Sequence, residues 1–160
     1  MKIEDEIKQK AFHSIHQKAV VNLIYTSNWL LGAQQKFLSL FGITTQQFNI
    51  LRILRGQHPN GVSATTIKAR MLDKNSDVSR LLNRLVKKEL IIKKSCPSDK
   101  RATDIFITER GLKVLDEINK ERHKIDNVLC LTDAEAELLS DLLDKARGTT
   151  PSPIPLSQNP

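Results

Sequence analysis

Apolar residues recur at steps of three and four through the first quarter of the chain, with no proline among them. This spacing predicts a very long helix from Ile3 to Phe41, in which Gly32 is the weak position and a bend is expected near residues 27–28. Gly42 follows and is expected to end the helix. The chain is therefore predicted to begin with one extended helical segment.

Two shorter helices are predicted next, each with a recognisable first residue. Thr44 and Gln47 have the spacing of a capping box, so a helix is expected to begin there and to stop before the turn at residues 58–61. Ser63 is a suitable N-cap residue for a short helix over residues 64–72.

Residues 75–90 form the most informative helical segment because its two faces differ. Its apolar face consists of Val78, Leu81, Leu82 and Leu85. Its polar face consists of Ser76, Arg80, Asn83 and Lys87, with Ser79 and Arg84 beside them. Short donors and acceptors and guanidinium forks are groups that pair with base edges and phosphates in a major groove. The segment is therefore predicted to be a recognition helix.

Two strands are predicted after this helix, over residues 90–95 and 102–107, with Pro97 and Ser98 in the turn between them. Four basic side chains surround the turn, namely Lys93, Lys94, Lys100 and Arg101. A hairpin that follows a helix-turn-helix lies beside the neighbouring minor groove, where negative potential attracts arginine. The hairpin is therefore predicted to be a wing.

The C-terminal part is predicted to hold two more helices and a tail. Thr108 is expected to cap a helix whose apolar side reaches Leu129, and a second capping box precedes a helix with a leucine stripe over residues 138–143. These helices and the long first helix are expected to pair with a second copy, so that two recognition helices read a two-fold symmetric site. From Gly148 the chain is rich in proline and is expected to be a flexible tail or an arm on the dimer.

The distribution of charge supports a polyanionic partner. The net charge is +7, from 25 basic and 18 acidic residues. Residues 62–110 hold 12 basic and 6 acidic residues, which gives +6, so the remaining 111 residues carry 13 minus 12, or +1. A local excess of this kind is typical of a surface that binds phosphates, although a solvated face is the alternative interpretation.

Several classes of protein do not fit the sequence. No apolar run is long enough to span a membrane and Met1 is not followed by a signal peptide, so a cytoplasmic protein is expected. Cys96 and Cys130 form neither a disulfide framework nor a zinc site, and the four histidines are scattered, so no metal and no cofactor is expected. The sequence contains no phosphate loop, nucleophile elbow or metal motif, so it is not expected to be an enzyme.

The residues also resemble a known family. The stretches DVSRLLNRLVKKELI and SDKRATDIFITERGLKVL are similar to the MarR family of bacterial transcription regulators, including its Asp-x-Arg wing motif at residues 99–101. The resemblance implies that Asp99 orients the wing and that Arg101 enters the minor groove. It also implies a homodimer that represses or, less often, activates promoters. Glu89 departs from the family pattern, in which a glycine is usual before Leu90.

The resemblance further implies release of DNA by a small anionic or phenolic effector. In relatives the effector pocket lies between the winged unit and the dimerisation helices, a region that here includes Tyr25 and Trp29. A core or dimer-interface role is the alternative for both aromatic residues. Cys96 among basic residues leaves a thiol-based redox sensor open as a rival mechanism.

These inferences give one prediction for the whole chain. The fold is mainly α, a winged helix-turn-helix with a three-helix core, a two-stranded wing and long N- and C-terminal dimerisation helices. The boundaries are 1–42 for the N-terminal dimerisation helix, 43–108 for the winged unit, 109–147 for the C-terminal helices and 148–160 for the tail.

The predicted partner is double-stranded DNA, bound by a homodimeric transcription regulator at a palindromic promoter site. The family resemblance implies that the regulator is a repressor. A winged helix that binds protein or RNA is the alternative. The predicted DNA-binding residues are Ser63, Thr65, Ser76, Asp77, Ser79, Arg80, Asn83, Arg84, Lys87, Lys93, Lys94, Asp99, Lys100 and Arg101.

Overall fold

The structure is a computed structural model of the chain, and it describes all residues except 97–98, 122–126 and 149–160. For residues 96 and 99–102 it describes the backbone. The chain forms two compact units, Met1–Ile125 and Asp126–Pro160. The predicted proline-rich tail lies outside the described residues from residue 149 onward.

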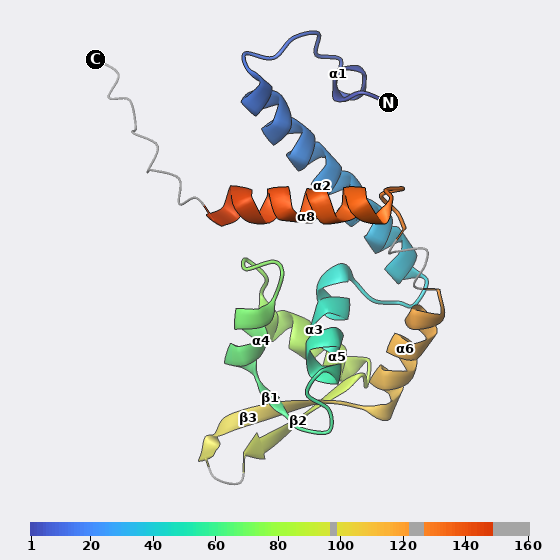
Figure 1. The fold of residues 1–160 in the computed structure, drawn as a ribbon. Coiled ribbons are helices and arrows are strands. Elements are labelled where there is room, and N and C mark those ends of the chain that lie inside the picture. The colour runs from blue at the N-terminus through green and yellow to red at the C-terminus, as the bar shows by residue number, and fades with distance from the viewer. Residues whose placement is uncertain (97–98, 122–126, 149–160) are drawn as a thin grey trace, which may run out of the picture. The chain divides into compact units, whose positions relative to one another are not determined.

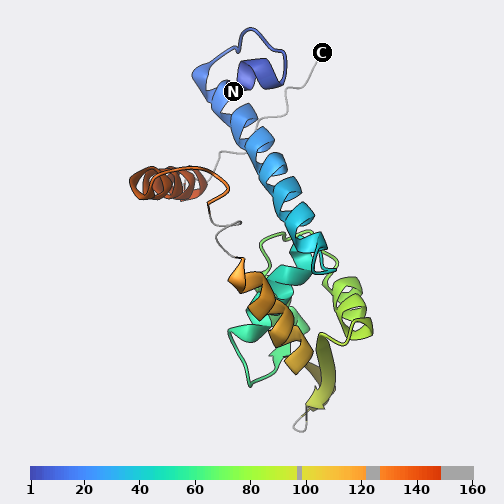
Figure 2. The same ribbon diagram turned by 90° about the vertical axis from the view of Figure 1, so that its right-hand side faces the viewer.

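The N-terminal segment is two helices rather than the single long helix predicted from its spacing. The helix α1 (Ile3–Glu6) ends after one turn, Lys8 takes a positive φ of 54°, and α2 (Ile15–Ser39) begins anew. Ser14 caps α2, because its side chain accepts a 3.0 Å hydrogen bond from the Gln17 amide. The expectation of a continuous helix from Ile3 was therefore wrong. Figure 2 shows α2 as one long helix that leads from the winged unit toward α1.

The winged unit contains the predicted helices and one additional short strand. Its elements are α3 (Thr45–Arg55), β1 (Val62–Ser63), α4 (Ala64–Arg70), α5 (Val78–Lys87), β2 (Ile91–Cys96), β3 (Asp99–Ile107) and α6 (Glu109–Lys120). The strands form an antiparallel sheet in the order β1-β3-β2, and β2 and β3 form the hairpin seen in Figure 1. The mainly helical winged-helix fold is confirmed, and β1 extends the two-stranded wing to three strands.

The predicted caps account for where three of these helices begin. Thr44 and Gln47 form the expected capping box of α3, Ser63 caps α4, and Thr108 caps α6. Each of these side chains satisfies a backbone N–H that has no partner within its own helix.

One continuous hydrophobic core holds the winged unit together. It is formed by apolar side chains from the end of α2, from α3 to α6 and from the sheet, including Leu38, Ile50, Leu51, Leu54, Ile67, Met71, Leu82, Leu85, Ile91, Ile105, Leu115 and Ile118. Ile50, Leu51, Ile67, Leu85 and Leu115 are completely buried. Burial of side chains of this size stabilises the fold by about 1.5 to 3 kcal/mol each. The core therefore joins the winged unit predicted over residues 43–108 to the end of α2 and to α6.

The C-terminal part differs from the prediction in helix length. The helix α6 ends at Lys120, and Leu129 lies in a turn over residues 127–129, so the single helix predicted to reach Leu129 was wrong. Ile125, which was placed in that helix, lies outside the described residues. The second helix is present as α8 (Asp133–Gly148), and Thr132 and Glu135 form the predicted capping box. None of the helices in the described ranges is long and apolar enough to cross a membrane.

Candidate nucleic-acid interface

The helix α5 has one buried and one exposed face, as its sequence predicted. Val78, Leu82 and Leu85 are buried in the core, and Leu81 packs partly buried against it. The exposed polar side chains are Ser79, Arg80, Asn83, Arg84 and Lys87. Figure 1 shows α5 next to the three-stranded sheet from which the β2–β3 hairpin extends. The exposed face of α5 is therefore the candidate reading surface of the winged unit.

Two residues of the predicted DNA-binding set have structural roles at the start of α5. Asp77 is the N-cap, because its Oδ1 accepts a 3.0 Å hydrogen bond from the Arg80 amide. Ser76 precedes the helix, and its hydroxyl donates to Oδ2 of Asp73 at 2.9 Å. The Asp77 carboxylate is also stabilised by the positive end of the helix dipole. The sequence pattern Ser-Asp-Val carried this capping signal, which the assignment to DNA binding overlooked.

Ser63 has a similar capping role at the start of α4. The Ser63 hydroxyl accepts the Thr66 amide at 3.1 Å and so caps the helix. Thr65 is exposed on the first turn of α4. Ser63 therefore caps α4, and the DNA contacts of Ser63 and Thr65 stay predictions.

The base of the hairpin contacts the exposed face of α5. The Lys93 ammonium donates a hydrogen bond to Oδ1 of Asn83 at 2.8 Å. The next residue, Lys94, places its ammonium 5.3 Å from the centre of the Phe106 ring. A cation over an aromatic face is stabilised by about 0.5 to 1 kcal/mol at an exposed site. The Lys93 ammonium is therefore held by α5, whereas the Lys94 ammonium, among the residues that the structure describes, has only the ring contact and stays exposed.

The tip of the hairpin carries the remaining predicted contacts. Asp99, Lys100 and Arg101 belong to the first residues of β3, and their side chains lie outside the described residues. The same holds for the side chain of Cys96, while residues 97–98 are not described at all. The roles predicted for these residues stay predictions.

The C-terminal end of α5 is closed by a non-glycine residue in the left-handed conformation. Glu89 has φ 59°, its amide donates to the Val86 carbonyl at 2.8 Å, and the Leu90 amide donates to the Leu85 carbonyl at 3.1 Å. These two bonds form a Schellman motif, in which glycine is preferred because it has no Cβ. Glu89 therefore adopts the turn geometry that a glycine would adopt.

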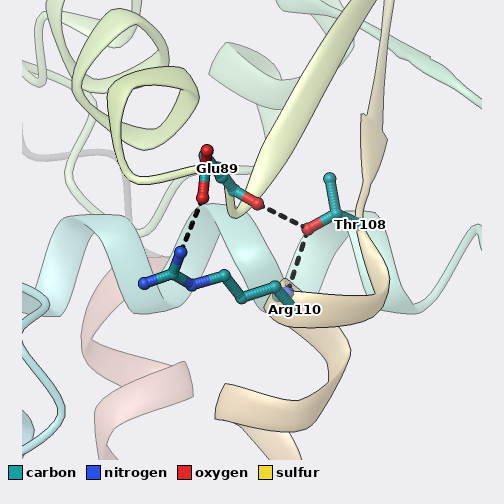
Figure 3. Close-up of polar contacts among 4 residues, drawn as sticks. Glu89, Thr108 and Arg110 are labelled. Carbon is teal, nitrogen blue, oxygen red and sulfur yellow. Dashed lines mark hydrogen bonds and ion pairs between the residues drawn. The ribbon is translucent and has the colours of Figure 1, made fainter.

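Contacts of Glu89 connect this turn to the start of α6, as Figure 3 shows. The Thr108 hydroxyl donates to the Glu89 carbonyl at 2.8 Å and accepts the Gly111 amide at 3.0 Å. The Glu89 carboxylate pairs with Arg110 at 2.6 Å, although both side chains are largely exposed. Exposed pairs contribute little, about 0 to 1 kcal/mol. The hydrogen bonds of Thr108 are therefore the stronger part of this connection.

Lys88 connects the same end of α5 to the junction of α2 and α3. Its ammonium donates to the Gly42 carbonyl and, at 3.2 Å, to Oε1 of Gln47. Gln47 is 1% exposed and also accepts the Thr44 amide at 3.1 Å. The sequence did not distinguish Lys88 from the neighbouring Lys87, because both are lysines at the end of one helix.

The proposed effector residues lie on α2. Tyr25 and Trp29 are both exposed. The Tyr25 hydroxyl donates to Glu6 of α1 at 2.6 Å, and this hydrogen bond raises the pKa of Tyr25. No three His, Cys, Asp or Glu side chains within the described ranges come together as metal ligands.

Comparison with known proteins places this geometry in a family. The sequence model of the MarR family matches residues 41–102. The uncharacterised HTH-type transcriptional regulator YpoP of Bacillus subtilis (strain 168) is 35% identical over 106 residues, which are 64% of this chain and 73% of YpoP. The chain belongs to the MarR family. It is accordingly a transcription regulator and not an enzyme.

Solved structures share the MarR-family fold. The crystal structure of the S. aureus MepR–DNA complex has a TM-score of 0.71 and 23% identity, and it covers 80% of this chain and 95% of the MepR chain. CouR from Rhodococcus jostii RHA1, crystallised with p-coumaroyl-CoA, has a TM-score of 0.65 and 21% identity over 87% of this chain and 98% of its own. Both similarities concern the fold.

Proposed function

We propose that this MarR-family protein is a repressor that binds a palindromic promoter site in double-stranded DNA as a homodimer. The observation that carries the proposal is the exposed face of α5, which presents Arg80, Asn83, Arg84 and Lys87 opposite a face that is buried in the core. Guanidinium and amide groups on one helix face are suited to guanine and adenine edges in the major groove. MepR, which has the same fold, was crystallised with DNA.

The exposed apolar residues of α2 and α8 support a homodimer. On α2 they include Val20, Leu23, Ile24 and Leu31, and on α8 they are Leu138, Leu139 and Leu142. Apolar side chains that gather in this number on the surface of a single chain are typical of an interface. A second copy of the chain is the partner that a two-fold symmetric DNA site requires.

The hairpin supplies the second proposed contact with DNA. Lys94, Lys100 and Arg101 lie on its two strands and add positive charge. Asp99 is expected to orient the tip, as the family resemblance implies. An arginine at such a tip is suited to a narrow minor groove, where the negative potential is strongest. The hairpin is thus expected to add affinity more than base discrimination.

A small effector is proposed to release the DNA. CouR was crystallised with p-coumaroyl-CoA, a ligand that is both phenolic and anionic. Tyr25 and Trp29 offer exposed aromatic surface on α2 for a phenolic group. The effector is therefore expected to be a small phenolic or anionic compound.

Selection of genomic DNA fragments by the purified protein tests the proposed function. The fragments should share a two-fold symmetric sequence, because two copies of α5 would read two half-sites. A set of bound fragments without a common sequence, or with a single unpaired half-site, would contradict the proposal.

Replacing Arg80 with alanine should then weaken binding to the selected site by roughly 5- to 150-fold, the equivalent of about 1 to 3 kcal/mol. Binding to random duplex should change much less, because the lost contact is to a base edge. Fluorescence anisotropy with selected and scrambled duplexes measures both effects. Equal losses on the two duplexes would show that Arg80 contacts phosphate.

The adjacent lysines at the end of α5 give a matched pair of variants. Lys87→Gln should reduce the slope of log affinity against log salt by about one per subunit, because Lys87 is exposed on the reading face. Lys88→Gln should leave that slope unchanged and lower the free energy of unfolding by about 1 kcal/mol, because its hydrogen bonds to Gly42 and Gln47 are lost. Salt titrations and urea unfolding distinguish the two lysines. A smaller slope for Lys88→Gln would place Lys88 on the DNA.

A further inference from the structure

The hydrogen bond between Lys93 and Asn83 joins the hairpin to the reading face of α5. The Lys93 ammonium and Oδ1 of Asn83 are 2.8 Å apart, and both residues are exposed. Asn83 lies between Arg80 and Lys87 on that face, while Lys93 belongs to β2. The contact is therefore made at the surface that is proposed to meet DNA.

The chemistry of the two groups fixes the orientation of the Asn83 amide. An ammonium group has three donors and no acceptor, so it pairs with the amide oxygen and not with the amide nitrogen. The alternative orientation would place the Asn83 NH2 group against a positive charge. The Lys93 contact therefore holds the oxygen toward the hairpin, and the NH2 group forms the other edge of the side chain.

This orientation determines which bases Asn83 is able to recognise. An asparagine recognises adenine when its oxygen accepts from N6 and its NH2 group donates to N7, so both edges must face the same base. In this protein the oxygen accepts from the Lys93 ammonium, so the N6 amino group of an adenine would have to compete with a charged donor for it. The Asn83 NH2 group then offers two N–H donors beside the Lys93 ammonium. These donors match the two acceptors of guanine, O6 and N7.

We propose that Lys93 is a specificity-determining residue that acts through Asn83, by holding its amide so that α5 reads guanine rather than adenine at one position of each half-site. This inference rests on the proposed function, because it needs a DNA site that is read by α5. It differs from the simpler role of Lys93 as a contact to phosphate, which would add affinity without changing the choice of base.

The neighbouring lysine provides a matched control. Lys94 lies one residue further along the same strand, so its side chain leaves the opposite face, and its ammonium rests over the Phe106 ring. Lys93→Met and Lys94→Met remove the same charge from the same hairpin and keep the aliphatic stem. Only the first of them removes the contact with Asn83.

The experiment is selection of binding sites from a randomised duplex library by the full chain and by four variants. These are Asn83→Ala, Lys93→Met, Lys94→Met and the double variant Asn83→Ala with Lys93→Met. The position read by Asn83 is the one at which Asn83→Ala abolishes the preference of the unmodified protein. At this position Lys93→Met should shift the preference from guanine toward adenine by roughly 5- to 150-fold, because the freed amide presents both edges to one base.

The other variants show whether Lys93 acts through Asn83. Lys94→Met should keep the guanine preference, and the double variant should have the same preferences as Asn83→Ala alone. An unchanged preference in Lys93→Met, or an adenine preference in the unmodified protein, would overturn the inference. If the unmodified protein selected no sequence at all, the proposed function would fail and the inference with it, which is a different result from a selected site that Lys93→Met leaves unchanged.

A measurement without DNA tests the contact itself. The side-chain NH2 resonances of Asn83 should shift in the NMR spectrum of Lys93→Met and stay in place in that of Lys94→Met. Equal spectra for the two variants would overturn the inference, because Lys93 would then not hold the Asn83 amide.

Discussion

Replacing Gly111 with alanine is expected to lower the free energy of unfolding of the winged unit by about 2 to 3 kcal/mol and its melting temperature by roughly 5 to 10 °C. A Cβ atom at this position would lie 2.4 Å from the carbonyl oxygen of Leu90 and 2.7 Å from Cγ1 of Ile107. The nearer of these atoms belongs to the backbone, so it cannot move aside as a flexible side chain would. The start of α6 would have to shift away from Leu90 and Ile107.

Such a shift would break the hydrogen bonds that connect α6 to the end of α5. The Thr108 amide donates to the Leu90 carbonyl at 3.1 Å, and the Thr108 hydroxyl donates to the Glu89 carbonyl at 2.8 Å. Each of them contributes about 0.5 to 1.5 kcal/mol to stability. Their loss adds to the cost of overpacking, while the higher helix propensity of alanine offsets about 1 kcal/mol.

The same substitution at Gly32 is the matched control, with an effect of the opposite sign. Gly32 is exposed on α2, and a Cβ atom there would meet nothing within 4 Å. Alanine should therefore stabilise α2 by about 0.5 to 1 kcal/mol through its helix propensity. Thermal unfolding followed by circular dichroism compares the two variants. Similar melting temperatures for Gly111→Ala and the unmodified protein would show that α6 is not in close contact with Leu90 and Ile107 at Gly111.

Local signals in the sequence predicted most of the winged unit. The caps at Thr44, Ser63 and Thr108 were found because an N-cap interaction depends on residues only three positions apart. The buried face of α5 was predicted for the same kind of reason, because Leu82 and Leu85 are three residues apart and so lie on the same face of a helix. Features of this kind need no knowledge of the rest of the chain.

The break between α1 and α2 was missed because periodicity alone does not reveal an interruption. The apolar spacing continues through residues 7–14, although Ser14 is a capable N-cap residue and caps α2. Contacts between α1 and α2 accompany the break, including the ion pair of Glu4 with Lys18 at 2.5 Å. This ion pair lowers the pKa of Glu4. It joins residues 14 positions apart, which no local pattern predicts.

The sequence predicted part of the geometry of the candidate interface, and the contacts that it did not predict have a common cause. The exposed set of Arg80, Asn83 and Lys87 followed from helical geometry, whereas the internal contacts of Lys88 and Lys93 did not. A lysine that reaches a carbonyl of another element has the same sequence signature as one that reaches solvent. Tertiary contacts therefore decide which cations are free to bind phosphates.

The salt dependence of DNA affinity should reflect the number of free cations. Within residues 62–110 the structure ties Lys74 to the Ala69 carbonyl, Lys88 to Gly42 and Arg110 to Glu89. Arg84 and Lys87 are exposed on α5, and Lys94 is exposed on the hairpin, where its ammonium lies over the Phe106 ring with no anionic partner in the described part of the chain. Three cations per subunit give six in a homodimer. These six are the minimum number of phosphate contacts expected for the proposed complex.

Affinity for the selected duplex should accordingly fall on the order of a thousandfold between 50 and 200 mM salt. Each neutralised phosphate contributes about −0.9 to the slope of log affinity against log salt, so six contacts give a slope of about −5. Fluorescence anisotropy at four or more salt concentrations measures this slope, and Lys88→Gln serves as the control that keeps it. A slope shallower than about −2 would correspond to about two phosphates. The proposal of a homodimer that places both α5 helices and both hairpins on one duplex would then be wrong, because such a complex brings all six cations to the phosphates.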